Sequence, residues 1–188
     1  MTITINGNGT IGGVSVGGLP DGIVDTDMLA SAAVTSAKVG SLGASNLPAG
    51  SVLQVVHGST KTNVTATTTA NTDTGLSASI TPSSASSKIL VLVSQNVFLY
   101  GATTISGNIF LYRNTTYVGT DTTYGIWTVA SGTPNELQVI YSINHLDSPA
   151  TTSSITYKTQ QVLRDGPAMR TQRDSGFTST MTLMEIAG

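Results

Sequence analysis

The chain has 188 residues, of which 10% are charged, with a formal net charge of −2 and no cysteine. These values exclude disulfide bonds, thiolate metal sites and cysteine nucleophiles, and they leave no basic surface for nucleic acid. An ordinary soluble domain carries about 25% charged residues, so a chain this poor in charge is more typical of a subunit packed against others than of a free monomer.

The first 50 residues predict an extended arm. They are rich in Gly, Ala and Ser, and such a backbone favours turns and close approach of chains over regular structure. One short helix is predicted over 26–39, because Met28, Leu29 and later alanines recur at helical spacing and Asp25 can cap the helix. A helix of about three turns is marginal in water, so we expect it to pack against its own β domain or another chain.

Residues 51–188 predict a β domain with about eight to ten short strands, separated by loops of Ser, Thr, Gly and Asn. The run Ile89–Val93 is continuously apolar and predicts a strand buried on both faces. Asn114 and Thr115 predict the turn of a hairpin. The whole pattern predicts an all-β fold, an antiparallel jelly-roll-like sandwich preceded by the Gly-rich arm. Strands are expected at Val52–Val56, Leu76–Ile80, Ile89–Val93, Val97–Tyr100, Ile109–Arg113, Tyr117–Val118, Gly125–Val129, Leu137–Ile143, Ile155–Val162 and Thr180–Ile186.

Motifs that carry cofactor or catalytic chemistry elsewhere have little support here. Gly7, Gly9 and Gly12 match the dinucleotide pattern G-x-G-x-x-G, but no helix can follow them directly, so we predict no cofactor. His57 and His145 are the two histidines. Neither belongs to a metal-binding spacing, and the chain has no G-x-S-x-G turn for a serine nucleophile. We predict no metal site and no catalytic triad.

The acidic residues also lack a catalytic pattern. Those at 21–27 suit turns and a helix cap, and Glu136 and Glu185 are isolated in the sequence. A polysaccharide-cleaving enzyme needs two carboxylates about 5–10 Å apart in a groove. This alternative stays open, although nothing in the sequence brings two of its possible contributors together. These contributors are Asp121, Glu136, Asp147 and Asp165.

Aromatic residues cluster in the middle of the β domain. Packing inside the fold is one interpretation, and stacking on sugars or contact with a partner is the other. Under the second interpretation, the candidate receptor contacts in the outer loops are Tyr117, Tyr124 and Trp127. The most charged loop, Arg164–Asp174, is interpreted as a surface tip or as a source of ion pairs between subunits.

Five segments carry a resemblance to a known family. They are VGGLPDGIVDTDMLA (16–30), AVTSAKV (33–39), LPAGSVLQVV (47–56), SSKILV (86–91) and STMTLMEIA (179–187). Together they resemble small structural proteins of tailed bacteriophages, of the tail-fibre, head-fibre or capsid-decoration type found in marine and cyanobacterial phages. The resemblance implies a non-enzymatic virion component that forms a homotrimer. Fibre proteins of this kind often carry a shaft or repeated A-V-T units, whereas this chain has one such unit and is short.

Two roles follow from the resemblance. In the first, residues 1–50 attach to a tail adaptor or to the capsid, and residues 51–188 trimerise and present their outer loops to a host cell-surface glycan. In the second, the chain is a capsid decoration, cement or head-fibre protein that stabilises the phage head. Both place the protein in the virion, without membrane insertion. The residues predicted to attach the arm are Ile11, Val14, Val16, Leu19, Met28 and Leu29.

Overall fold

The computed structural model describes residues 4–5, 11–12, 46–102, 104–119, 125–128 and 135–188. Contacts between residues divide the chain into two compact units, Met1–Gly43 and Ala44–Gly188. In the first unit, strands β1 (Thr4–Ile5) and β2 (Ile11–Gly12) pair antiparallel, with Ile5 opposite Ile11. The helix predicted over 26–39 lies outside the described residues.

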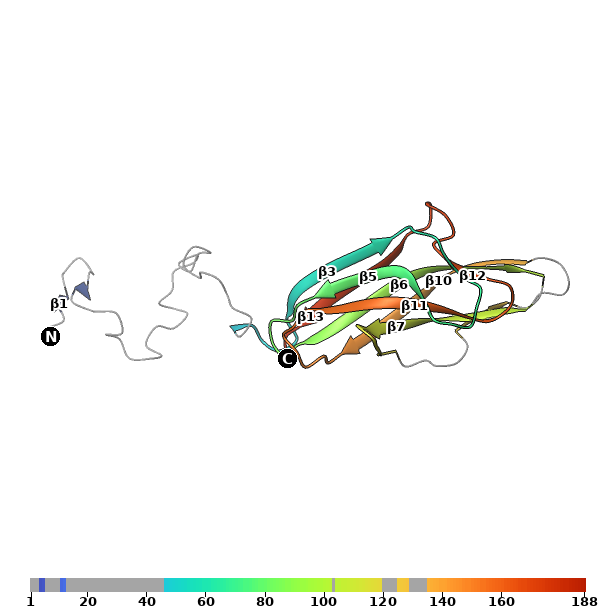
Figure 1. The fold of residues 1–188 in the computed structure, drawn as a ribbon. Helices are drawn as coiled ribbons and strands as arrows, with labels where there is room; N and C mark the ends of the chain where they lie inside the picture. The colour runs from blue at the N-terminus through green and yellow to red at the C-terminus, as the bar shows by residue number, and fades with distance from the viewer. Residues whose placement is uncertain (1–3, 6–10, 13–45, 103, 120–124, 129–134) are drawn as a thin grey trace. The chain divides into compact units, whose positions relative to one another are not determined.

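The second unit is a sandwich of two antiparallel sheets, so the predicted all-β fold is confirmed (Figure 1). We call the sheet that contains β3 the first sheet and the sheet that contains β5 the second sheet. The first has the order β3-β13-β6-β12-β4, with β10 also paired to β6, and the second has the order β5-β11-β7-β8, with β9 also paired to β7. The strands are β3 (Val52–Thr60), β4 (Val64–Ala66), β5 (Thr72–Ile80), β6 (Lys88–Gly101), β7 (Ile105–Arg113), β8 (Thr116–Tyr117), β9 (Ile126–Thr128), β10 (Asn135–Asp147), β11 (Ile155–Asp165), β12 (Met169–Thr171) and β13 (Ser179–Ile186).

The connectivity is that of a jelly roll. Long strands alternate between the sheets along the chain, and β3, the first long strand, pairs with β13, the last. Gly50 N and Ala187 N donate hydrogen bonds to Ala187 O and Ser51 O, each at 2.8 Å, so the unit begins and ends side by side. We call this the terminal end. Strand β6 starts there and runs to Gly101, which marks the distal end of the sandwich.

Side chains alternate along each strand between the core and the outside, as a pleated strand requires. Strand β5 follows its predicted pattern, with every second residue from Thr74 to Ile80 buried. The prediction that Ile89–Val93 is buried on both faces is wrong. Val91 and its neighbours two residues away face the core, whereas Leu90 and Leu92 are half-buried on the outer face of the first sheet. A continuous apolar run does not reveal whether a second layer covers the strand.

The core consists of two apolar clusters separated by a polar layer. One cluster lies toward the terminal end and includes Val91 and Leu183, and the other lies toward the distal end and includes Leu99 and Leu163. Between the two clusters lie core-facing residues whose polar side chains are fully buried. These residues are Thr74, Gln95, Thr159, Gln161 and Ser179.

Ser179 is the centre of this polar layer. Its hydroxyl oxygen accepts hydrogen bonds from Gln95 Nε2 at 2.9 Å and from the Asn96 main-chain nitrogen at 2.8 Å. Because the oxygen already accepts twice, its own proton is directed at the side-chain oxygen of Gln172, 2.7 Å away. One small hydroxyl therefore connects β13, β6 and the segment after β12.

The layer also bridges the two sheets. Gln95 Oε1 on the first sheet accepts a hydrogen bond from Thr159 Oγ1 on the second at 2.8 Å. The Thr74 and Thr159 hydroxyls lie 2.5 Å apart. Gln172 has a φ of 48°, a conformation uncommon outside glycine, and its amide nitrogen donates to the main-chain oxygens of Thr62 and Thr74. These bonds hold one relative position of the sheets, because any slip leaves buried polar groups unpaired.

Two clusters of hydrogen-bonded polar side chains lie at the terminal end. The Glu185 carboxylate is fully buried and accepts hydrogen bonds from Ser83 N at 2.7 Å and from Ser83 Oγ and Gln54 Nε2 at 2.6 Å. Burial raises the pKa of Glu185, but these donors outweigh burial and hold the pKa below its usual value. Glu185 is isolated in the sequence but has hydrogen-bond partners in the fold. The hydrogen bonds tie the loop after β5 to β13.

The second group joins Arg113, Asp147 and Tyr157. Asp147 Oδ2 accepts a hydrogen bond from Tyr157 Oη at 2.6 Å and lies 2.8 Å from the Arg113 guanidinium. Burial and then the Asp147 hydrogen bond raise the pKa of Tyr157 well above its usual range. Asp147 is thus committed to a structural contact between β10, β7 and β11.

We predict that Ser179→Ala lowers the free energy of unfolding by about 2–4 kcal/mol, because three buried partners lose a hydrogen bond at once. The exposed Ser142→Ala on β10 is the control and should change it by less than about 0.5 kcal/mol. Urea denaturation of both variants measures the difference. Equal midpoints for Ser179→Ala and the parent chain would contradict the role given to the polar layer.

We predict that Glu185→Gln lowers the free energy of unfolding by about 1–3 kcal/mol at neutral pH. The amide group replaces one acceptor oxygen with an N–H donor, which then faces the donors of Ser83 or Gln54. The folded-state pKa of Glu185 is lowered, so its contribution is complete above the unfolded value of about 4.3 and is lost as pH falls through the folded value. The difference in stability between parent and variant should therefore narrow between pH 6 and pH 3 in urea denaturation. A difference that stays constant over this range would refute the assignment.

Candidate binding surface

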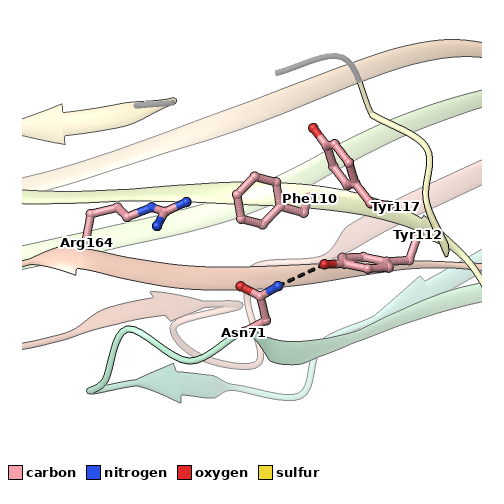
Figure 2. A pocket seen from close by; sticks show the side chains of 5 residues that line it. All are labelled: Asn71, Phe110, Tyr112, Tyr117 and Arg164. Atoms are coloured by element: carbon pink, nitrogen blue, oxygen red, sulfur yellow. Dashed lines mark hydrogen bonds between the residues drawn. The ribbon is translucent and has the colours of Figure 1, made fainter. Parts of the chain in front are cut away.

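The outer face of the second sheet carries a groove lined by aromatic side chains (Figure 2). We call it the aromatic groove, and it has a volume of about 300 Å³. Ligand pockets in proteins begin at about this size. Four strands or their flanks supply its lining, so pairing of β5, β11, β7 and β8 brings together residues that are far apart in the sequence. The lining residues are Asn71, Phe110, Tyr112, Tyr117 and Arg164.

The groove has a buried floor and an accessible rim. Phe110 is 7% exposed although it points away from the core, whereas Tyr112 and Tyr117 are half-buried. The Tyr117 ring meets Phe110 edge to face, with centroids 5.4 Å apart, and lies 5.8 Å from Tyr112. The Arg164 guanidinium stands over the Phe110 ring at 5.8 Å. The aromatic rings are thus fixed by one another before any ligand arrives.

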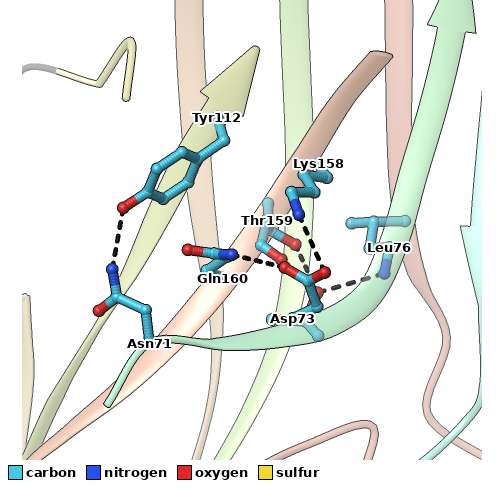
Figure 3. A network of polar contacts seen from close by, with 8 residues as sticks. Asn71, Asp73, Leu76, Tyr112, Lys158, Thr159 and Gln160 are labelled. Carbon is cyan, nitrogen blue, oxygen red and sulfur yellow. Dashed lines mark hydrogen bonds and ion pairs between the residues drawn. The ribbon is translucent and has the colours of Figure 1, made fainter. Parts of the chain in front are cut away.

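Polar groups flank the rings. Asn71 Nδ2 donates to Tyr112 Oη at 2.8 Å, and Asp73 on the same face binds Lys158 at 2.9 Å and Gln160 at 2.6 Å (Figure 3). Burial raises the pKa of Asp73, but the hydrogen bonds from Gln160 and Lys158 outweigh it and lower the pKa below its usual value. Asp73 is therefore ionised and occupied as an acceptor at neutral pH.

The chemistry of the groove suits the recognition of a sugar ring. Aromatic faces pack against the C–H face of a pyranose, and amide and guanidinium groups hydrogen-bond its hydroxyls. Asn71 and Arg164 are exposed and offer such donors beside Tyr117. The three rings and these two polar side chains form a site that can bind a ligand without catalysing a reaction.

A different surface lies near the terminal end, on the outer face of the first sheet. Val55, Met184, Leu90 and Leu146 stand directly opposite one another across β3, β13, β6 and β10. We call them the apolar row. Val55 is 57% exposed and Leu146 is 53% exposed, so the row faces the outside. Apolar side chains aligned across four strands favour contact with another protein surface.

Only some of the predicted site residues lie within the described part of the chain. Tyr117 lines the aromatic groove, and Trp127 lies in β9, where its main chain pairs with Ser106 of β7. Tyr124 lies outside the described residues. Ile11 lies in β2, where it pairs with Ile5. The other predicted arm residues also lie outside the described part of the chain, namely Val14, Val16, Leu19, Met28 and Leu29.

Sequence reasoning missed most of the aromatic groove and misjudged one loop. Asn71, Phe110 and Arg164 carry no local signal, because only the pairing of β11 with both β5 and β7 brings them together. The interpretation of Arg164–Asp174 as one charged loop is wrong, since it contains β12. Arg173 lies 3.4 Å from Glu136 of the same chain, so this pair is internal, and Glu136 is not isolated.

Two contacts among the described residues bear on the enzymatic alternatives, whereas Asp121 lies outside those residues. His57 Nδ1 contacts Thr182 Oγ1 at 3.2 Å. The Asp147 carboxylate that follows His145 is bound by Arg113 and Tyr157 instead. Within the described ranges, no three His, Asp or Glu side chains are placed to hold a metal ion. That part of the chain also has no helix with the length and hydrophobicity to cross a bilayer.

No family model matches the chain, and no curated sequence is significantly similar to it. Inferences about function therefore rest on the surfaces described above and on the resemblance carried by the five sequence segments.

We predict that the floor and the rim of the aromatic groove differ in their effect on folding. Phe110→Ala should lower the free energy of unfolding by about 3–5 kcal/mol, because it empties a buried position. Arg164→Gln should change it by less than about 0.5 kcal/mol. Thermal or urea denaturation measures both, and a large loss for Arg164→Gln would mean that the rim is structural and not available to a ligand.

Proposed function

We propose that the protein is a non-enzymatic surface protein of a phage virion, a short trimeric fibre or spike that recognises a glycan on the host cell. The aromatic groove carries this proposal. It offers pre-positioned rings and exposed polar donors, the two elements that bind a sugar, on a rigid sheet. The resemblance of five sequence segments to phage structural proteins supports the virion setting.

The arrangement of the fold supports outward presentation. The β unit begins and ends at its terminal end, where the preceding arm joins it. The aromatic groove lies along the outer face of the second sheet, from Tyr112 beside Arg113 to Arg164 near the end of β11. A unit held at its terminal end would leave the groove accessible to a cell surface. Jelly rolls also occur in capsid and lectin domains, a fold-level analogy in accord with both settings.

Self-association fits the composition and the apolar row. With 10% charged residues and a net charge of −2, copies of the chain repel one another weakly. In the proposed trimer, threefold symmetry closes the assembly and covers apolar surface. The apolar row is the described surface that supports such a contact.

A second candidate function rests on the same row. As a capsid decoration, cement or head-fibre protein, the chain would place Val55 and Leu146 against the phage head and stabilise it. The exposure of these residues beside the terminal end favours this role. The aromatic groove favours host recognition, and the two roles are separated by whether the groove binds sugars.

The test is binding of neutral sugars to the full chain by saturation-transfer NMR, with the methyl glycosides of glucose, galactose and mannose as probes. We predict that at least one binds, and that Tyr117→Ala weakens its affinity about tenfold, or about 1.4 kcal/mol, by removing the stacking ring.

The control is Ile140→Ala, which removes an exposed side chain from the other sheet, outside both the apolar row and the lining of any groove discussed here, and should leave neutral-sugar binding unchanged. If none of the three glycosides binds, host recognition through the groove is wrong and the capsid role becomes the better account. Equal losses in the two variants would show that the sugars do not bind in the groove.

A further inference from the structure

A second groove lies at the distal end, on the outer face of the first sheet. It has a volume of about 250 Å³ and is formed by the ends of β6 and β12 and the segment that precedes β12. We call it the distal groove. Its lining is mostly apolar, apart from one guanidinium and one phenol. The lining residues are Phe98, Tyr100, Gly101, Pro167, Ala168 and Arg170.

Two parallel rings form its aromatic side. Phe98 and Tyr100 alternate along β6, so both face outward, and their rings are stacked with centroids 6.5 Å apart and planes inclined by 6°. Phe98 is nearly buried, because the Arg173 guanidinium covers it at 4.1 Å. Tyr100 is 50% exposed. The ring that a ligand can reach is therefore Tyr100.

The two arginines near these rings differ in their partners. Arg173 is held between the Phe98 ring and the carboxylate of Glu136, 3.4 Å away, so its charge is compensated. Arg170 stands opposite Phe98 in the pairing of β12 with β6 and is exposed. Among the described residues, no carboxylate lies within ion-pair distance of Arg170. The distal groove thus presents one uncompensated positive charge beside an exposed aromatic ring.

We infer that the distal groove binds an acidic sugar, a pyranose that carries a carboxylate such as a hexuronic acid. The apolar face of the ring packs on Tyr100, and the carboxylate accepts two parallel hydrogen bonds from the Arg170 guanidinium. Arginine suits this task because its planar donors match the two oxygens of a carboxylate. A neutral sugar keeps the stacking but loses the charged contact.

This inference extends the proposed function, since it assigns a class of glycan to a second site on the same domain. The two sites use different sheets and share no residue. Failure of one therefore leaves the other standing, and the variants that test them are different.

The test compares methyl glucuronide with methyl glucoside by NMR titration of the isotope-labelled full chain. The glucuronide should shift the amide signals of Gly101, Ala168 and Arg170 in a saturable way and bind at least fivefold more tightly there than the glucoside. Its affinity should fall as salt is added, because the contact is between charges at the surface.

Two arginine variants make the test specific. Arg170→Gln should weaken glucuronide binding at the distal groove at least fivefold, whereas Arg164→Gln, an exposed arginine beside the rings of the aromatic groove, should leave it unchanged. Equal binding of the two sugars at the distal groove would overturn the inference, as would unchanged glucuronide affinity in Arg170→Gln. Glucuronide shifts confined to the aromatic groove would also overturn it, while preserving the proposed function.

Discussion

The buried polar layer around Ser179 is the constraint on which the sandwich depends. Apolar side chains tolerate small displacements, but a buried hydroxyl or amide that loses its partner costs about 1–3 kcal/mol. Ser179, Gln95 and Thr159 join three strands from both sheets. The layer therefore fixes how the sheets lie against each other.

Strand pairing within each sheet forms three separate outer surfaces on one unit. The second sheet carries the aromatic groove, and the first sheet carries the apolar row near the terminal end and the distal groove at the opposite end. The row and the two grooves share no residue. Few free charges lie near these surfaces in the described part of the chain. Most charged groups described there, such as Asp73 and Arg173, form ion pairs within the chain.

The sequence predicts those features that depend on local pattern. Alternation from Leu76 to Ile80 identifies β5, and the turn at Asn114 identifies the hairpin, since Asn tolerates the φ of 53° found there. Strands β4 and β12 were missed because three residues are too few to show a period. Both grooves were missed for a different reason. Arg164 approaches Phe110 only through long-range pairing, which no local pattern encodes.

We propose that this β unit is displayed on a phage virion and recognises a host glycan. Immunogold labelling of intact particles of the encoding phage, with antibody raised against residues 51–188, tests it most directly. The account predicts gold on the tail, where the grooves would meet the host surface. Gold over the head would contradict host recognition and establish capsid attachment as the working function, and particles without gold would contradict a place in the virion altogether.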